Sequence, residues 1–230
     1  MRALLSLPLL ALACAKVTAP PAPAPLLPGY LSDPEHSPPP SCPGYSHLSA
    51  VGASSEGYGA ALDQAKHNLL AKLGDGIRAE AESFAHLFSM DGSPSPEHLD
   101  LQRVLEEVDF AHPDLVEIAG PPQRWGKKIY VVACLARGPT IARLEGDVAR
   151  EAVRFDTWDQ AAQDAQSRAD QPAFAAALSN LAGVMAATAP TLVQIRVLAG
   201  GPGRLERRLT ARWLASVEAA SKLRAQVPQQ

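Results

Sequence analysis

The three cysteines of this sequence, Cys14, Cys42 and Cys134, are the side chains with the clearest chemical potential. A thiolate is a strong nucleophile, so a cysteine can be acylated, oxidised or bound to a metal. Cys14 differs from the other two because an apolar segment precedes it and a proline-rich segment follows it. This setting predicts a modification of Cys14, whereas Cys42 and Cys134 are candidates for a bond with each other.

Residues 1–13 have the pattern of an export signal. Arg2 supplies a positive charge, and residues 3–12 form an apolar segment that only Ser6 and Pro8 interrupt. A membrane-spanning helix needs about 20 apolar residues, so this segment is too short to be one. We therefore interpret residues 1–13 as a signal peptide.

The four residues "ALAC" that end at Cys14 resemble the lipobox of bacterial lipoprotein signals, in which small residues precede the cysteine. The resemblance implies a diacylglyceryl group on the Cys14 thiol and a further acyl chain, such as palmitate, on its amino group. Two or more acyl chains hold a protein stably on a membrane. Ala15 stands where an aspartate would imply inner-membrane retention, so the resemblance implies the cell outer membrane, with the domain facing the periplasm or the cell surface. The alternative is an ordinary secretory signal in which Cys14 is incidental.

Proline dominates the segment that follows. Residues 20–43 contain ten of the 21 prolines of the chain. Proline lacks a backbone donor and fixes φ, which favours the extended polyproline II conformation. We expect residues 14–45 to form a tether that spans on the order of 90 Å when fully extended. Such a tether would let an anchored domain reach a distant partner, or would only keep the domain off the lipid surface.

The sequence leaves two states open for Cys42 and Cys134. In an oxidising periplasm they can form a disulfide that fastens the end of the tether to a strand. Alternatively, Cys134 is buried and inert while Cys42 is exposed. His36, Cys42 and His47 form the only cluster of metal-ligating residue types, and their spacing matches no standard zinc pattern. We therefore expect no metal site.

No motif in the sequence predicts catalysis. There is no G-x-S-x-G motif, and Glu106 and Glu107 are adjacent on a predicted helix, so they point in different directions. The glycine-rich residues 200–203 lack the lysine and the preceding strand of a phosphate-binding loop, which predicts a helix breaker. The net charge of −3 and the absence of a long basic run argue against nucleic-acid binding. We expect no enzymatic activity and no cofactor.

The remaining pattern predicts an α+β fold. We expect strands at residues 48–54, 77–82, 114–120 and 127–137, a turn at 121–128, and helices at 58–74 and 97–110. The strand at 77–82 is expected because apolar and charged residues alternate there and Gly74 and Gly76 precede it. Both faces of the strand at 127–137 are apolar, so it should be covered on both sides. We expect the carboxy-terminal helices to supply one of these covers.

From Ile141 onward the periodicity is helical throughout. The first two apolar stripes contain Leu144, Val148, Ala152, Phe155, Ala162 and Ala165, and then Phe174, Leu178, Leu181 and Met185. We expect Pro190 to end the second helix. A third stripe after the breaker contains Leu205, Leu209, Trp213, Val217 and Ala220.

This order of elements resembles the Lpp-twenty type of bacterial outer-membrane lipoprotein, and is similar to the amino-terminal domain of flagellar-associated envelope lipoproteins. The matching stretches are "SAVGASSEGYGAALDQAKHNLLAKLGDGIRAEAES" and "QRWGKKIYVVACLAR", within residues 46–137. The resemblance implies an α+β domain with helices against a small antiparallel sheet, and no enzymatic activity. The expected organisation is a signal peptide (1–13), a tether (14–45), an α+β domain (46–138) and an α-helical extension packed on or beside the sheet (139–230).

Together these features predict a non-enzymatic, lipid-anchored envelope lipoprotein that acts as an interaction or assembly module. Its expected partners are the membrane, through lipidated Cys14, and an unidentified envelope protein. The alternative is a tethered activator or adaptor of cell-wall or flagellar machinery that reaches its partner through the proline-rich segment. A third hypothesis, an envelope enzyme, would require a pocket with perturbed titratable groups.

Overall fold

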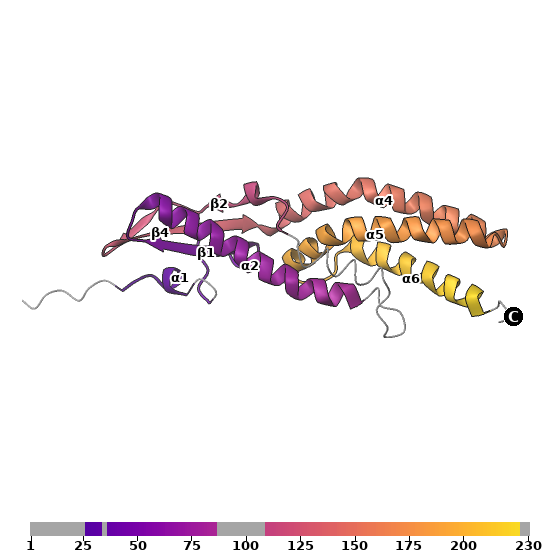
Figure 1. Ribbon diagram of the computed structural model, residues 1–230. Helices are drawn as coiled ribbons and strands as arrows, with labels where there is room; N and C mark the ends of the chain where they lie inside the picture. Colours follow the sequence, from indigo (N-terminus) through magenta and orange to yellow (C-terminus); the bar gives the residue numbers. More distant parts are fainter. Residues whose placement is uncertain (1–25, 34–35, 87–108, 226–230) are drawn as a thin grey trace, which may run out of the picture.

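The computed structural model describes residues 26–33, 36–86 and 109–225 of the 230-residue chain. The molecule is elongated, with a small sheet at one end and long helices at the other (Figure 1). This is the α+β architecture that the sequence predicts, with an antiparallel sheet followed by carboxy-terminal helices. Cys14, Glu106, Glu107 and nearly all of the helix predicted at 97–110 lie outside the described residues.

The sheet has four strands, and the first three all pair with the last one. They are β1 (His47–Ser54), β2 (Glu117–Ile118), β3 (Gln123–Trp125) and β4 (Lys128–Ala136). β1 pairs antiparallel with one edge of β4, while β2 and β3 pair antiparallel with the other. A 3-10 turn, η1 (Pro113–Leu115), precedes β2. The strands expected at 48–54 and 127–137 are confirmed, the one at 114–120 is shorter, and the expected turn at 121–128 contains β3.

Helix α2 (Tyr58–His86) connects the sheet to the helical end of the molecule. It has 29 residues, so it is about 44 Å long. One buried apolar stripe runs along it: Ala61, Ala65, Leu69, Leu73, Ile77, Ala81 and Phe84. The prediction of a strand at 77–82 is therefore wrong. The stripe continues there at helical spacing, and this packing, with the good helix propensities of Ala, Glu and Arg, outweighs the cost of Gly74 and Gly76.

Three further helices form the other end of the molecule: α4 (Arg137–Ser167), α5 (Gln171–Ala199) and α6 (Arg204–Ala225). α4 and α5 form a hairpin, and α6 packs on both. The Asp170 carboxylate caps α5 by accepting a hydrogen bond from the Ala173 amide at 3.1 Å. Gly200 ends α5 in the left-handed conformation at φ 72°, which confirms residues 200–203 as a helix breaker. The α4 stripe is buried as predicted.

Pro190 does not end the second helix, contrary to the prediction. α5 continues through it to Ala199 because buried residues lie on both sides, including Met185, Leu192 and Ile195. Their packing outweighs the cost of a proline inside a helix, which is about 3 kcal/mol. α5 is long and apolar enough to cross a membrane by length and composition alone, but 56% of its most apolar window is buried inside the protein.

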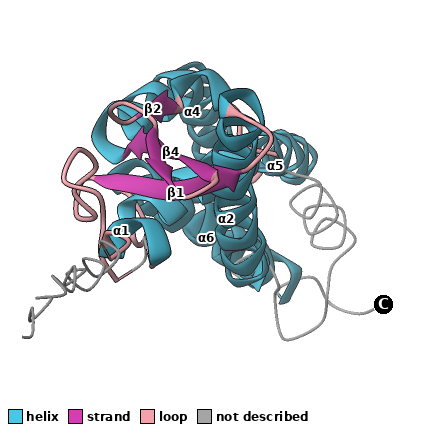
Figure 2. Cartoon of the chain, turned by 90° about the vertical axis from the view of Figure 1, so that its left-hand side faces the viewer, coloured by secondary structure: helices cyan, strands magenta, loops and turns pink. Residues whose placement is uncertain are grey.

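One apolar core runs through the sheet and the helices. It includes side chains from β1, β4, α2, α4, α5 and α6, so it is continuous across the predicted domain boundary at residue 138. Seen from the sheet end, the helices lie behind the strands (Figure 2). α2 covers one face of β4, and α4 leads away from the end of that strand. The prediction that the carboxy-terminal helices cover β4 is therefore wrong, because the amino-terminal segment provides the second cover.

Candidate functional site

The second face of β4 lies against residues 26–33 and 36–45, which we call the N-terminal cover. This segment includes the short helix α1 (Gly29–Ser32). Leu31 and Cys42 of the cover are buried together with Val132 and Cys134 of β4. Part of the expected tether at 14–45 is thus packed on the sheet. The cover explains why both faces of β4 are apolar.

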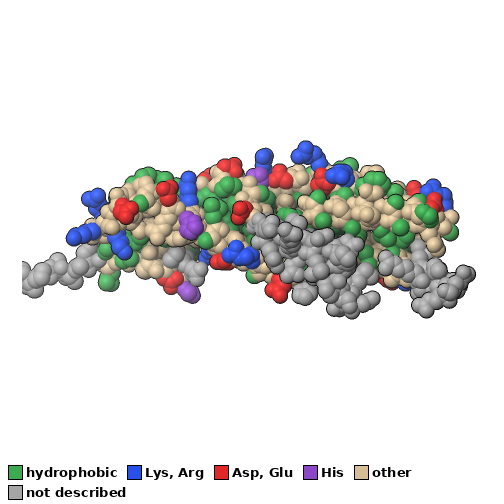
Figure 3. Space-filling view, viewed as in Figure 1, with side chains coloured by type: hydrophobic (Ala, Val, Ile, Leu, Met, Phe, Trp, Pro, Cys, Tyr) green, Lys and Arg blue, Asp and Glu red, His purple; other side chains and the backbone are tan. Residues whose placement is uncertain are grey.

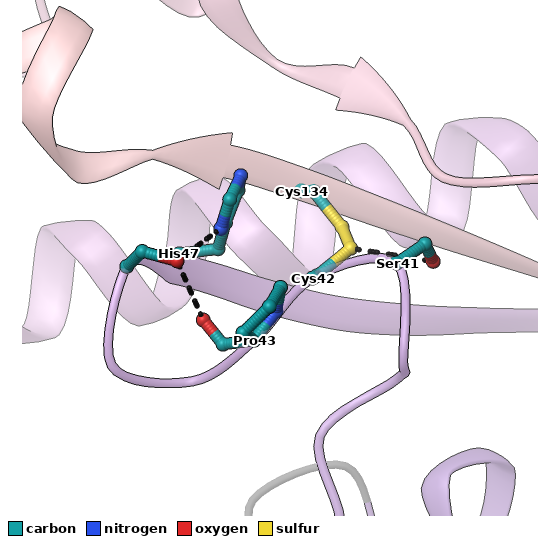
Figure 4. Close-up of a disulfide and its surroundings, with 6 residues drawn as sticks. Ser41, Cys42, Pro43, His47 and Cys134 are labelled. Atoms are coloured by element: carbon teal, nitrogen blue, oxygen red, sulfur yellow. Dashed lines mark hydrogen bonds between the residues drawn. A yellow bond between two sulfur atoms is a disulfide. The ribbon is translucent and has the colours of Figure 1, made fainter.

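A disulfide joins the N-terminal cover to β4 (Figure 4). It links Cys42 to Cys134 across 92 residues of sequence, with the two Cα atoms 6.1 Å apart. Cys42 is fully buried and Cys134 is 5% exposed. Thiol–disulfide exchange requires access of a thiolate to a sulfur atom, so burial protects this bond from reducing thiols. The structure therefore brings together the two cysteines that the sequence proposes as partners, in a setting suited to a permanent link.

The chain turns directly from this disulfide into β1. The carbonyl oxygen of Pro43 accepts hydrogen bonds from the amides of Ser46 and His47, at 3.0 and 2.9 Å. The Ser46 hydroxyl lies 2.8 Å from Nδ1 of His47. His36 pairs with Asp33 at 2.9 Å, and Cys42 is oxidised, so the sequence cluster of His36, Cys42 and His47 is not assembled into a ligand set. Within the described ranges no group of three His, Cys, Asp or Glu side chains could hold a metal ion.

A shallow hollow of about 260 Å³ lies between the cover and the β-hairpin. Its lining carries no charged side chain and is mostly apolar, and it includes Tyr30, Pro39, Pro121 and Tyr130. Gln123 donates a hydrogen bond to the Tyr30 hydroxyl across it. Sites for small molecules are usually larger, at about 300–1,000 Å³, and contain placed polar groups. The hollow is therefore better explained as the seam where the cover meets the sheet.

Both edges of the sheet are protected against the addition of another strand. On β1, the Ala53 amide donates to the Gln64 side chain at 3.0 Å, and the Asn68 side chain donates to the Val51 carbonyl at 2.8 Å. Between β2 and β3, residues 120–122 (Gly-Pro-Pro) interrupt the pairing with β4. Exposed edge strands invite pairing with other chains, and side-chain bonds and prolines prevent it. Partner binding by strand addition is thus disfavoured.

A buried carboxylate fastens α4 to α6. Asp159 accepts hydrogen bonds from Arg212 at 3.0 Å, Gln163 at 2.9 Å and Ser216 at 3.2 Å. Arg212 also pairs with Asp156 and lies 5.5 Å from the centre of the Phe155 ring. A hollow of about 160 Å³ beside this cluster has Asp159 and Arg212 in its wall. Because these charges bond to each other between α4 and α6, the cluster explains how the two helices pack.

A second buried charge cluster joins α2, α5 and α6. Nε of Arg196 lies 3.1 Å from an Oε atom of Glu206, and its Nη1 lies 3.3 Å from Glu80. The guanidinium also lies 5.8 Å from the centre of the Phe84 ring. Glu206 is only 2% exposed, and burial raises the pKa of its carboxyl above the usual 4.5, although Arg196 opposes the shift. The sequence signal for this cluster is Arg196, the one charged side chain in the apolar helix α5.

This raised pKa predicts a pH dependence of stability. The folded chain holds the Glu206 proton more tightly than the unfolded chain does, so the contribution of Glu206 to stability falls as pH rises from about 4.5 through the raised pKa. We expect the Tm of the parent chain minus that of Glu206→Gln to decrease between pH 4 and pH 7. The matched control is Glu218→Gln, because Lys222 lowers the pKa of Glu218 and the trend should reverse. A difference for Glu206→Gln that is constant or increases with pH would contradict the assignment.

Two contacts fasten the chain just after residue 108. The Gln194 side chain accepts from the Ala111 amide at 3.0 Å and donates to the Asp109 carbonyl at 3.3 Å. Nε2 of His112 lies 2.6 Å from Asp147. A histidine–carboxylate pair can support general-base catalysis, but it needs a nucleophile within hydrogen-bond reach. In the described part of the chain no hydroxyl or thiol bonds to His112, so this pair serves to attach the segment to α4.

No protein-family model, curated protein or solved structure matches this chain. The resemblance to the Lpp-twenty type family remains a prediction. One element of the order that supports it, a strand at 77–82, is helical in the structure. The function must therefore be inferred from the residues and contacts of the chain itself.

Proposed function

We propose that this chain is a non-enzymatic, lipid-anchored lipoprotein of the bacterial cell envelope, and that its folded part is an interaction or assembly module. The observation that carries the proposal is the buried Cys42–Cys134 disulfide. Disulfides form and persist in oxidising compartments such as the periplasm. This agrees with an export signal at residues 1–13 and with acylation at Cys14.

The position of the N-terminal cover determines how far the folded part can lie from an anchor at Cys14. Twelve residue steps separate Cys14 from Leu26, where the described chain begins. They span at most about 40 Å, whatever their conformation. Because Leu27, Tyr30 and Leu31 also pack against β4, the reach is less than half of that expected for a free tether at 14–45. This favours a module held near the membrane over an adaptor that reaches its partner through the proline-rich segment.

A module without enzymatic activity is also consistent with the chemistry of the described residues. The buried carboxylates Asp159 and Glu206 are paired with arginines from neighbouring helices. The two hollows described above are smaller than most small-molecule sites. These features support a role in which the surface, not an internal site, carries the function.

Metabolic labelling tests the anchor. Cells that express the tagged chain are given an alkyne analogue of palmitate, and the labelled protein is detected after a coupling reaction. We expect label on the parent chain and on Cys42→Ser, and none on Cys14→Ser. Label on all three variants, or on none of them, would contradict acylation at Cys14.

Cross-linking in cells tests the module. The tagged parent chain is cross-linked, the envelope is extracted, and the captured proteins are identified by mass spectrometry. We expect a reproducible envelope partner that is lost in Cys14→Ser, because the unanchored domain leaves the membrane. A chain that captures nothing above background would contradict an interaction module.

A further inference from the structure

The β3–β4 hairpin carries a concentrated positive charge. Arg124, Lys127 and Lys128 are exposed, and Trp125 between them is half-buried. The whole chain has a formal net charge of −3, so this charge is local. In the part of the chain that the structure describes, none of the three basic side chains forms an ion pair. Figure 3 shows Lys and Arg side chains gathered at this end of the molecule.

The hairpin lies where the amino-terminal part of the chain enters the fold. The described chain begins at Leu26, at the same end of the molecule as the turn between β3 and β4 (Figure 1). The hydrogen bond from Gln123 to the Tyr30 hydroxyl joins the two segments. An anchor at Cys14, at most about 40 Å of chain away, would place its membrane within reach of this end.

The loop after β1 adds an acidic and an aromatic side chain to this end of the molecule. Ser54 pairs with Ile129, so the loop after β1 lies beside the hairpin and brings exposed Glu56 to this end. Tyr58, at the start of α2 and 44% exposed, adds a second aromatic ring. Basic and aromatic side chains together are typical of protein surfaces that contact lipid headgroups.

We propose that the β3–β4 hairpin binds the anionic headgroups of the membrane that holds the lipid anchor. This inference rests on the proposed function, because the anchor brings the hairpin to the lipid. Each Lys or Arg near an anionic surface strengthens binding about fivefold, and the Trp125 indole is suited to the interface. The hairpin then orients the molecule. The distal ends of α4, α5 and α6 point away from the membrane, because they lie at the opposite end of the molecule (Figure 1).

Tryptophan fluorescence can test this contact on the full acylated chain. The protein is reconstituted into vesicles of phosphatidylcholine alone, or of phosphatidylcholine with 30% phosphatidylglycerol, each with a brominated lipid as quencher. The Trp125→Phe variant supplies the background from Trp158 and Trp213, so the difference reports Trp125. We expect quenching of Trp125 to be at least twofold stronger in the anionic vesicles and to weaken in 0.5 M salt.

Two triple variants with the same change in charge make the test specific. Arg124→Gln/Lys127→Gln/Lys128→Gln should reduce quenching to the level in neutral vesicles. Arg143→Gln/Arg150→Gln/Arg154→Gln, along α4, should leave it unchanged. Equal quenching in both vesicle types, or an equal loss in both triple variants, would overturn the hairpin contact. Flotation of the vesicles reports anchoring separately. A chain that does not float with either vesicle type would overturn the proposed anchor, and the inference with it.

Discussion

Replacing Gly52 with alanine is expected to lower the free energy of unfolding by about 3 kcal/mol or more. Gly52 is buried in β1, where α2 crosses the strand. A Cβ atom at this position would overlap the backbone oxygen of Ala61 and the backbone nitrogen of Ala65. Backbone atoms cannot rotate aside as a side chain can, so the helix would have to move away from the sheet and open the core.

Urea denaturation of the parent chain and the Gly52→Ala variant measures this effect. The matched control is Gly146→Ala, because Gly146 is exposed in α4 and a Cβ there would meet nothing within 4 Å. Alanine is the better helix former, so the control should stabilise the chain by about 0.5–1 kcal/mol. Equal effects of the two substitutions would show that α2 does not lie against β1 as described.

Removal of the disulfide is the second change with a large expected effect. Loop-entropy estimates for a bond that closes about 90 residues predict a loss of about 4–5 kcal/mol, so Cys42→Ala/Cys134→Ala should be destabilised by about 4 kcal/mol. Besides this loss of global stability, we expect the N-terminal cover itself to detach more readily from the sheet. Without the bond the N-terminal cover is held by Leu31 and a few neighbours, and its release would expose Val132 and Tyr130.

Limited proteolysis and urea denaturation together separate these two consequences. We expect cleavage within residues 26–45 to be much faster in the double variant, and the unfolding midpoint to fall. The control is Cys14→Ser, which should change neither. Equal protection of the cover with and without the bond would contradict its role as a clamp.

Periodicity in the sequence is sufficient to predict the elements in which apolar residues recur at a regular spacing. The β4 strand was recognisable because both of its faces are apolar, and the α4 stripe because Leu144, Val148 and Phe155 recur at helical spacing. Gly76 and Pro190 misled the prediction because tertiary packing outweighed local preference. At Gly76 the missing side chain lets α5 approach, since a Cβ there would lie 3.0 Å from Val197. Such a contact is invisible before the helices are placed.

The N-terminal cover was missed for a related reason. Its prolines predict an extended tether, and that composition gives no sign of the burial of Leu31 and Cys42. The one signal was Cys42 itself, since a bond to Cys134 would require the segment to lie on the strand. The hairpin residues Arg124, Lys127 and Lys128 were visible in the sequence as a turn, and their significance depends on where the chain enters the fold.

Intact mass spectrometry of the protein extracted from membranes is the most direct test of a lipid-anchored module with a disulfide clamp. We predict a chain that begins at Cys14, carries the mass of a diacylglyceryl group and a further acyl chain, and gains two hydrogens only after unfolding and reduction. A mature chain without acyl groups would contradict the anchor. Two thiols that can be alkylated in the unfolded protein before reduction would contradict the clamp.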